Sequence, residues 1–419
     1  MDALTTPLPK DWEAVKVEDI FEIITDFSAA GSFAQQSQMV QYTNDRINYA
    51  QLIRTTELKN GFNNTNAIYI NKEAFEFLWR VNLNSDAIIL PNIGINCGEI
   101  YYVDIKKLIH KHNALAPNAI LLRTKKANLK FLFYAFLDTW FQKQLINIIT
   151  SSAQPKFTKT DLRDLLIPLP PLNEQIAIAN ILSDVDHYLY SLDALILKKE
   201  SVKKALSFEL LSQRKRLKGF NQNWQKVRLG DIATFLKGKG LSKSQVSPNA
   251  KHECILYGEL FTHYDRVVTN IKSFTNIYDN PMLSLNNDVL MSGSAETPDI
   301  LATASCILKK GVILGGDILI IRPNSNLLNG CFLAYCIVYD KNQVLSKVVG
   351  STVYHLYAKD LKDFEILLPS LNEQIAIANI LSDVDHEIIS LKNKKRQFEN
   401  IKKALNHDLM SAKIRVLKK

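Results

Sequence analysis

The sequence predicts an α+β protein in tandem duplication, with two globular halves that each lead into one long helix. The run LNEQIAIANILSDVDH at residues 172–187 recurs letter for letter at residues 371–386, 199 residues later. Short β-rich runs separated by Asn, Gly, Ser and Pro fill the region before each copy. Apolar residues at spacings of three and four follow each copy's start, which is the period of a helix.

Composition limits the class of protein. The 419 residues are enough for two domains, and the 47% hydrophobic content is ordinary for a globular chain. No apolar run approaches the ~18–20 residues of a membrane span, and residues 1–17 lack the basic and apolar regions of a secretory signal. The five cysteines form no C-x-x-C pair, and no histidines cluster at metal-ligand spacing. We expect a cytoplasmic protein with no metal, disulfide or membrane segment.

The duplication spans the chain and includes one change of length. The offset between matched positions is 199 residues around the identical run, 202 further upstream and 212 near the start of each copy. Examples are the pairs Arg123 and Arg322, Glu57 and Glu259, Asp86 and Asp288, and Trp12 and Trp224. The first copy therefore holds 13 more residues, inserted within its globular half.

Each globular half contains strand signals and one helical stretch. The β-rich runs are AIILPNIGI and NAILLRT in the first half, and DVLMSG and DILIIRP in the second. The helical stretches are residues 129–146 and 327–338. Strands and helices in the same half predict the α+β class.

The long helices have clear start signals. Pro171 and Pro369 lie just outside them, and Asn173 and Asn372 are suitable N-caps. About 40 residues at ~1.5 Å each predict a rod of roughly 60 Å. Because each helix carries an apolar stripe, we expect the two helices to pack on one another as a coiled coil. The alternative is that each helix packs on its own globular half. The expected stripes are Ile181, Val185, Tyr188, Leu192, Leu195, Val202 and Leu206, and Ile380, Val384, Leu391, Phe398, Ile401 and Leu405.

The net charge of +9 lies on two short segments. Residues 198–218 carry eight Lys or Arg against two Glu, and residues 392–419 carry ten against two acids. The rest of the chain is net acidic. A role in contacting DNA phosphates and a role as the solvated face of a coiled coil both fit these segments.

The identity of the helix starts has a functional interpretation. The globular halves diverged while the helix starts did not, so both starts are expected to face the same kind of external partner. Recent gene conversion of one segment is the alternative. The candidate partner-binding residues are Asn173, Glu174, Gln175, Asn180 and Asp184, and Asn372, Glu373, Gln374, Asn379 and Asp383.

Two motifs in this arrangement resemble a known family. They are IPLPPLNEQ at the helix entry, repeated as ILLPSLNEQ, and the stretch from Gly350-Ser351-Thr352 through Leu356 to Asp360-Leu361. The first copy has Thr150-Ser151-Ser152 at this point, without the Gly. The whole chain is similar to the specificity (S) subunits of type I restriction-modification systems.

The resemblance implies an architecture and partners. Residues 1–170 and 220–369 would be target recognition domains, each reading one half of a bipartite double-stranded DNA site. Residues 171–219 and 370–419 would be conserved helices, packed antiparallel with pseudo-two-fold symmetry, that set the distance between half-sites. Two modification (M) subunits, which bind S-adenosylmethionine and methylate adenine, would dock on these helices. Restriction (R) subunits would add ATP- and Mg-dependent translocation and cleavage, and this chain would hold no cofactor.

Groove-facing loops with Arg, Lys, Asn, Gln, Ser and Thr are the expected DNA readers. The 237–243 loop is the strongest phosphate-contact candidate, because its glycines let backbone and lysines approach closely. Each of these residue types also forms turns, so a structural role is the alternative at any one position. The candidates are Arg54, Thr55, Thr56, Asn92, Asn96, Ser152, Gln154, Lys156, Lys237, Lys239, Lys243, Ser292, Ser294, Ser351, Thr352, Tyr354 and His355.

No catalytic residues are expected in this chain. Asn280-Pro281-Met282 lacks the second Pro and the aromatic residue of an adenine methyltransferase pocket, and Gly238-Lys239-Gly240 has the wrong spacing for a phosphate loop. His187 and His386 belong to the duplicated helix start and are not expected to bind metal. The leading hypothesis is a non-catalytic DNA-recognition subunit. A coiled-coil scaffold with two protein-binding heads and a single-chain enzyme are the alternatives.

Overall fold

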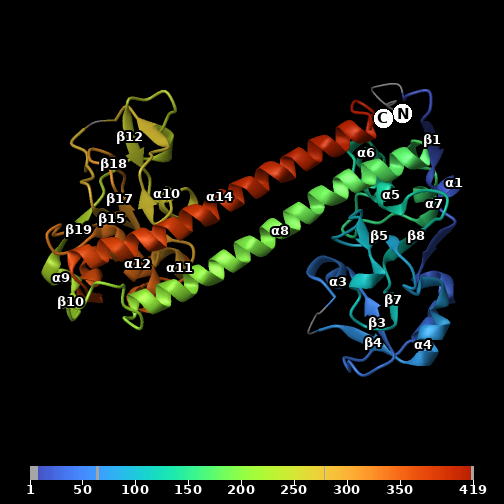
Figure 1. The fold of residues 1–419 in the computed structure, drawn as a ribbon, viewed down its shortest axis with the longest axis horizontal. Coiled ribbons are helices and arrows are strands. Elements are labelled where there is room, and N and C mark those ends of the chain that lie inside the picture. The colour runs from blue at the N-terminus through green and yellow to red at the C-terminus, as the bar shows by residue number, and fades with distance from the viewer. Residues whose placement is uncertain (1–7, 63–65, 278, 417–419) are drawn as a thin grey trace. The chain divides into compact units, whose positions relative to one another are not determined.

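The chain folds into two compact units that share both long helices. The computed structural model describes residues 8–62, 66–277 and 279–416 (Figure 1). The first unit extends to Ser191 and resumes at Lys395, and the second is Leu192–Lys394. We call residues 8–171 the first head and residues 220–370 the second head. Lys418 and Lys419 of the predicted basic segment, and the start of the first predicted domain, lie outside the described residues.

The first head is built on three small sheets. A four-stranded sheet has the order β2-β8-β5-β6, a three-stranded sheet has the order β4-β3-β7, and β1 pairs with β9. Its strands are β1 (Glu13–Lys16), β2 (Ile23–Asp26), β3 (Ala50–Ile53), β4 (Ile68–Ile70), β5 (Ala87–Pro91), β6 (Tyr101–Val103), β7 (Asn113–Leu115), β8 (Ala119–Arg123) and β9 (Leu166–Leu169). Its helices are α1 (Val17–Ile20), α2 (Phe33–Met39), α3 (Thr55–Asn60), α4 (Lys72–Phe77), α5 (Leu129–Phe136), α6 (Thr139–Ile148) and α7 (Lys159–Arg163).

The second head repeats this plan. Its main sheet has the order β11-β19-β15-β17-β13, with β14-β12-β18, β10-β21 and β16-β20 beside it. Its strands are β10 (Gln225–Arg228), β11 (Ala233–Lys237), β12 (His252–Ile255), β13 (Val267–Val268), β14 (Ser273–Thr275), β15 (Asp288–Ser292), β16 (Ser294–Ala295), β17 (Ser305–Ile307), β18 (Ile313–Leu314), β19 (Ile318–Pro323), β20 (Tyr354–His355) and β21 (Glu365–Leu368). Its helices are α9 (Leu229–Ile232), α10 (Glu259–Thr262), α11 (Pro298–Leu301), α12 (Gly330–Tyr339) and α13 (Lys341–Leu345).

The predicted α+β class is confirmed in both heads. The four β-rich runs form β5 and β8 in the first head and β15 and β19 in the second, and these strands are almost wholly buried. The helical stretch 129–146 is interrupted, because Asp138 accepts a hydrogen bond from the Trp140 amide at 2.9 Å and starts α6 as its N-cap. The sequence analysis expected one uninterrupted helical stretch here.

The two long helices are α8 (Leu172–Leu211) and α14 (Leu371–Met410), of 40 residues each. Both begin one residue before the asparagines predicted as caps, so Asn173 and Asn372 lie inside the first turn and the N-cap prediction was wrong. The carbonyl of Pro171 accepts the amide of Gln175 at 3.0 Å, which closes the first turn of α8.

Within each unit the helices run antiparallel and pack together, as predicted. In the first unit the Tyr188 ring lies 4.6 Å from the Phe398 ring, and Asp186 pairs with Lys402. In the second unit Lys199 pairs with Glu387 and Lys203 pairs with Asp385. In every pair the residue number rises on α8 while it falls on α14.

The helix starts also pack on their own heads, so both predicted packing modes occur. Ile178, Ala179 and Leu182 of α8 are buried in the first head's core, together with Leu409 and Met410 from the end of α14. In the second unit the start of α14 and the end of α8 do the same, through Ile377, Ala378, Leu381, Leu210 and Leu211. Each head's core is therefore completed by the far end of the other repeat's helix.

The predicted apolar stripe is partly out of register. Leu192 is buried as expected, but Ile196 is 7% exposed where the prediction placed the stripe on Leu195, which is 39% exposed. Ile181, Val202 and Ile401 are also exposed, at 37%, 40% and 51%. A helix of 3.6 residues per turn drifts against a fixed three-and-four spacing, which accounts for the shift.

Candidate functional site

Three predicted loops of the first head lie side by side. Ile93 and Lys156 form an isolated β-bridge, and the Gly94 amide donates to the Pro155 carbonyl at 2.9 Å. The Asn92 side chain donates to the Phe157 carbonyl at 3.0 Å. Lys59 at the end of α3 donates to the Asn96 side chain at 2.6 Å, which brings the 54–60 segment to the same place.

In the second head the equivalent loops also contact one another. Strand β16 pairs with β20 through Ser294 opposite His355, and the Leu356 amide donates to the Gly293 carbonyl at 3.0 Å. Lys237 lies 3.1 Å from Asp317, whose carbonyl accepts the Gly293 amide. Loops far apart in the sequence thus form one surface in each head.

The loop of residues 349–355 in the second head and the equivalent residues 150–156 in the first head are closed by the same backbone hydrogen bond. In the second head the Val349 amide donates to the His355 carbonyl at 3.0 Å, and Gly350 has a positive φ of 122°. In the first head the Thr150 amide donates to the Lys156 carbonyl at 3.0 Å, with Ser151 in the position of the glycine. The first copy therefore forms the closed loop without its Gly.

Exposure divides the candidate DNA readers into three groups. Ser292 and Ser294 are buried, and their hydroxyls donate to the Ser294 carbonyl and to Asp317, so their side chains shape the loop from inside. Half-buried candidates are Arg54, Thr55, Asn92, Asn96 and Tyr354. Exposed candidates are Thr56, Ser152, Gln154, Lys156, Lys237, Lys239, Lys243, Ser351, Thr352 and His355.

Arg54 is held by an internal ion pair. Its guanidinium donates to both oxygens of Glu57, at 3.0 and 2.6 Å, and to the Asn66 carbonyl at 2.8 Å. Glu57 is fully buried, and its hydrogen bonds raise the pKa of Arg54. The Arg54 side chain therefore anchors the start of α3, with its charge compensated locally.

The glutamates of the two helix starts are buried anchors. Arg415 donates to the two oxygens of Glu174 at 2.7 and 2.9 Å, and the Trp12 indole donates to the same carboxylate at 3.2 Å. Arg216 and Trp224 bind Glu373 in the same way, at 2.8, 2.9 and 3.1 Å. This pair of matched clusters accounts for the retention of both glutamates without an external partner.

The neighbouring glutamines are also used internally. Gln175 accepts the Asn128 amide at 2.9 Å and donates to the Pro170 carbonyl at 2.7 Å. Gln374 accepts the Asn329 amide at 2.8 Å and donates to the Pro369 carbonyl at 2.9 Å. The two glutamines thus join each helix start to the first turn of α5 or α12.

The other candidate docking residues lie on a solvent-exposed face of the identical run. On α8 the exposed residues follow helical spacing and include an apolar side chain, Ile176, which is 42% exposed. On α14 the equivalent Ile375 is 39% exposed. We call these two surfaces the twin faces: they are Asn173, Ile176, Asn180, Asp184 and His187, and Asn372, Ile375, Asn379, Asp383 and His386.

Lysines of both distal helix ends pair with acids of the opposite helix. Lys402 binds Asp186, whose other oxygen accepts the Tyr134 hydroxyl, and Lys203 and Tyr335 do the same for Asp385. Lys392 pairs with Glu200 at 2.6 Å. These pairs favour the coiled-coil interpretation for the lysines concerned.

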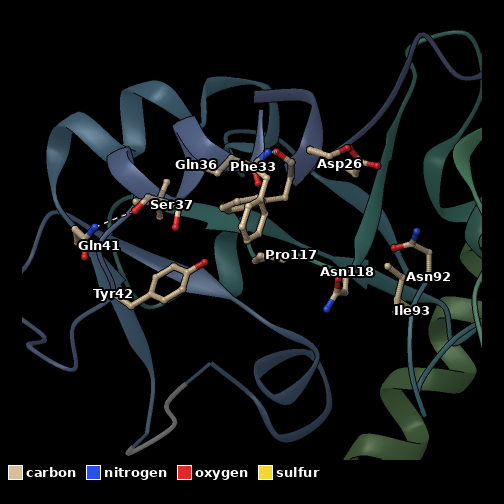
Figure 2. Close-up of a pocket in the computed structure, with 13 residues that line it drawn as sticks. Asp26, Phe33, Gln36, Ser37, Gln41, Tyr42, Asn92, Ile93, Pro117 and Asn118 are labelled. Carbon is tan, nitrogen blue, oxygen red and sulfur yellow. Dashed lines mark hydrogen bonds between the residues drawn. The ribbon is translucent and has the colours of Figure 1, made fainter. Parts of the chain in front are cut away.

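Sequence reasoning missed one concave site in the first head. A groove of ≈ 590 Å³ lies between α2 and the 92–93 and 117–118 turns. Figure 2 shows Phe33, Tyr42, Asn92 and Asn118 around this opening. The one available signal was the length difference, which adds residues to the first copy at this point.

Two further searches concern metal and membrane. Within residues 8–62, 66–277 and 279–416, no three His, Cys, Asp or Glu side chains gather in a way that could hold a metal ion. None of the helices in that part of the chain has the length and apolar content needed to cross a bilayer.

Comparisons with known proteins give one consistent answer. The family described as the type I restriction modification DNA specificity domain matches residues 9–199 and again 221–400. A Methanocaldococcus jannaschii chain assigned as the type I restriction enzyme MjaX specificity subunit is 29% identical, covering 98% of this chain and 95% of its own length. The type I restriction enzyme MjaVIII specificity subunit of the same organism is 26% identical, with coverages of 98% and 94%.

The fold has a counterpart among solved structures. The crystal structure of a type I restriction-modification S subunit from M. genitalium has a TM-score of 0.62 at 17% identity, covering 96% of this chain and 97% of that one. At this identity the likeness shows the fold alone. The two family matches, however, span most of both repeats, and the chain therefore belongs to the type I restriction-modification specificity (S) subunits, which are non-catalytic.

Proposed function

We propose that this chain reads a bipartite site on double-stranded DNA, one half-site per head. The main support is the loop surface that occurs in both heads. Its loops are joined by equivalent backbone hydrogen bonds in the two heads, but they carry different side chains. Equal backbone frames with unequal polar side chains suit two readers of different sequence. A duplex is nearly two-fold symmetric, so two related heads can each present their loops to one half-site.

The proposed contact surface consists of the exposed loop residues and the half-buried ones other than Arg54. Lys156, Lys239 and Lys243 are suited to phosphate contacts, while Gln154, Thr352 and His355 carry groups that bond base edges. The buried Ser292 and Ser294 and the paired Arg54 support the loops from behind. Residues 8–171 carry 18 Lys or Arg against 16 Asp or Glu, and residues 220–370 carry 15 against 13, so each head has a net charge of only +2 and the isolated subunit should bind DNA weakly.

The twin faces are proposed to dock two modification subunits, the adenine methyltransferases of the system. Identical side chains are exposed at both helix starts, and each face includes an exposed isoleucine. S-adenosylmethionine would bind in those subunits, and ATP and Mg in restriction subunits where present. The complex would act in the cytoplasm.

Exchange of one head tests the DNA-reading proposal. We would replace residues 8–171 with the first head of a relative and map methylated adenines in cells that carry the complex. One half of the methylated sequence should change while the other half stays. An unchanged sequence would reject DNA reading by this head and favour a scaffold with two protein-binding heads.

An insertion in α8 tests whether the helices set the spacer. Four residues added before Leu192 lengthen the helix by about 6 Å. The methylated sites should then show a different spacer, or methylation should stop. Methylation with the original spacer would contradict a measuring role for the helices.

Docking is tested by counting modification subunits per chain. Asn180→Arg places a bulky charge on one of the twin faces and should reduce the count from two to one in light scattering, and adding Asn379→Arg should abolish binding. Tyr190→Ala is the matched control, since Tyr190 is 76% exposed on the same helix but outside the identical run. Two subunits bound to the double variant would place docking elsewhere.

A further inference from the structure

The first head has a segment that the second head lacks. Residues 27–49 connect β2 to β3, whereas residues 238–251 connect the equivalent β11 and β12. The longer connection contains α2, which begins at Ser32 with a capping box formed with Gln35. Most of the length difference between the two copies is therefore used to build this helix.

Helix α2 has an unusual surface for a solvent-exposed helix. None of its seven residues is buried, and the sequence from Phe27 to Asn44 contains no charged residue. Exposed helix faces normally carry Lys, Glu or Arg. Here the exposed side chains are glutamines, a serine and apolar groups, among them Phe33, which is 85% exposed. Amide groups and an aromatic ring can form hydrogen bonds and apolar contacts with a ligand that is polar but uncharged.

One side of α2 forms a wall of the groove. Phe33, Gln36 and Val40 recur at helical spacing along this wall, and Gln41 and Tyr42 extend it. Asn92, Ile93, Pro117 and Asn118 form the opposite wall (Figure 2). Asp26 also lines the groove, and its charge is compensated by Lys159 at 2.8 Å. Because Ile93 bridges to Lys156, the groove is continuous with the loop surface proposed to contact DNA.

Among the described residues, the hydroxyls of Ser37 and Tyr42 and the side-chain amide of Asn118 line the groove and take part in no hydrogen bond. Gln36, by contrast, donates to the Gly31 carbonyl at 2.7 Å and is structural. The Tyr42 hydroxyl is protonated at neutral pH and can donate, and partial burial raises its pKa further.

The second head has this place filled. Gly238 packs so closely on Gly315 that an added Cβ would lie 1.9 Å from the Gly315 carbonyl oxygen. Asp317, which matches Asn118, pairs with Lys237 and accepts the Ser294 hydroxyl. The second head thus differs from the first at the positions that line the groove.

We propose that the α2 groove is a base-reading site of the first head, with the edges of one or two base pairs of duplex DNA as its ligand. This inference rests on the proposed DNA-reading function. Amide and hydroxyl groups bond base edges, and Phe33 offers an apolar contact for a thymine methyl group. Uncharged groups supply sequence discrimination without phosphate affinity, which the adjacent Lys156 can provide.

The test uses the full chain in complex with its modification subunit. Asn118 has a φ of 67°, so Asn118→Gly removes the amide and keeps the backbone conformation. Tyr42→Phe removes only the hydroxyl, and Phe33→Ala removes a ring that is almost wholly in solvent. Binding is measured on the mapped site and on sites with each base pair replaced, and head exchange identifies the first head's half-site.

We expect the double variant Tyr42→Phe with Asn118→Gly to lose about tenfold discrimination at one or two adjacent base pairs of the first half-site. Discrimination at the second half-site and the slope of affinity against salt should stay unchanged. Phe33→Ala should weaken a preference for thymine. Gln38→Ala is the control, because Gln38 is exposed on α2 but does not line the groove.

Three results would overturn the inference in different ways. Undiminished discrimination at every base pair would show that the groove does not read DNA, while the proposed function stands. A loss at both half-sites would mean that the substitutions act through the stability of the whole chain. If the unsubstituted complex itself shows no sequence preference, the proposed function fails and the groove inference fails with it.

Discussion

At the scale of single residues, the buried glutamates at the helix starts hold three parts of the chain together. Glu373 is 0% exposed and binds Arg216 from the segment that follows α8 and Trp224 from the start of the second head. Removing one partner of a buried pair leaves the other charge without compensation. The side chain of Arg216 is partly exposed, so water replaces some of what is lost.

We therefore expect Glu373→Gln to lower the free energy of unfolding of the second unit by about 2 kcal/mol. Urea unfolding followed by tryptophan fluorescence measures this, since Trp224 lies in the cluster. The control is Lys226→Gln, whose exposed pair with Glu365 should not matter to the midpoint. Equal midpoints for Glu373→Gln and the unsubstituted chain would show that the cluster adds no stability.

Sequence reasoning found these residues but gave them another role. Their identity in both copies indicated an external partner, while the structure shows that Glu174 and Gln175 are used up by internal bonds. The sequence could not show this, because Arg415 lies 241 positions from Glu174. Asn173, Asn180 and Asp184 are exposed, and their docking role stays a prediction.

At the scale of elements, close contact between two glycine turns positions β11 against the end of β18. The Gly238 amide donates to the Ile318 carbonyl at 2.8 Å, and the Lys239 amide donates to the Leu314 carbonyl at 3.0 Å. These bonds bring Gly238 against the Gly315 backbone, where no side chain fits. The predicted phosphate-contact loop 237–243 therefore has a structural glycine at its start.

Gly238→Ala should destabilise the second unit by about 1–3 kcal/mol, the usual cost of overpacking. Gly240→Ala, two residues away, should have little effect, since nothing lies within 4 Å of its added Cβ. Thermal unfolding of the two variants provides the comparison. Equal stability would mean that the turns separate without cost.

The elements that the sequence predicted best are those with a strong local pattern of apolar residues. The four β-rich runs and both long helices were found, because burial on both faces and a repeated three-and-four spacing are local signals. Helix α2 was missed since its residues are exposed and show no apolar period. The break at Asp138 was missed because it depends on a single capping side chain.

At the scale of the whole molecule, each unit is completed by a segment from the other repeat. Arg415, Lys402 and Leu409 complete the first unit, and the first repeat itself contains their equivalents Arg216, Lys203 and Leu210. A fragment of residues 1–219 thus carries both the receiving and the completing groups.

Two such fragments should complete one another, so we expect the fragment to form a homodimer in light scattering. Arg216→Ala should weaken this dimer, because the charge facing Glu174 is lost. A fragment that stays monomeric and folded would show that the first head needs no completing helix end.

The loops, in contrast, could be assigned to one surface only from the structure, since their contacts join residues that are 65 positions apart.

Each head is bound to the start of its helix by the same three hydrogen bonds. An indole, a backbone amide and a phenol of the first head, from Trp12, Asn128 and Tyr134, bind Glu174, Gln175 and Asp186 of α8. Trp224, Asn329 and Tyr335 repeat this on α14. A head from a relative that supplies these three groups could therefore bind α8 or α14 without changes to the helix. If each head reads one half-site as proposed, exchange of heads at these helix starts would give new pairs of half-sites while the helices stay unchanged.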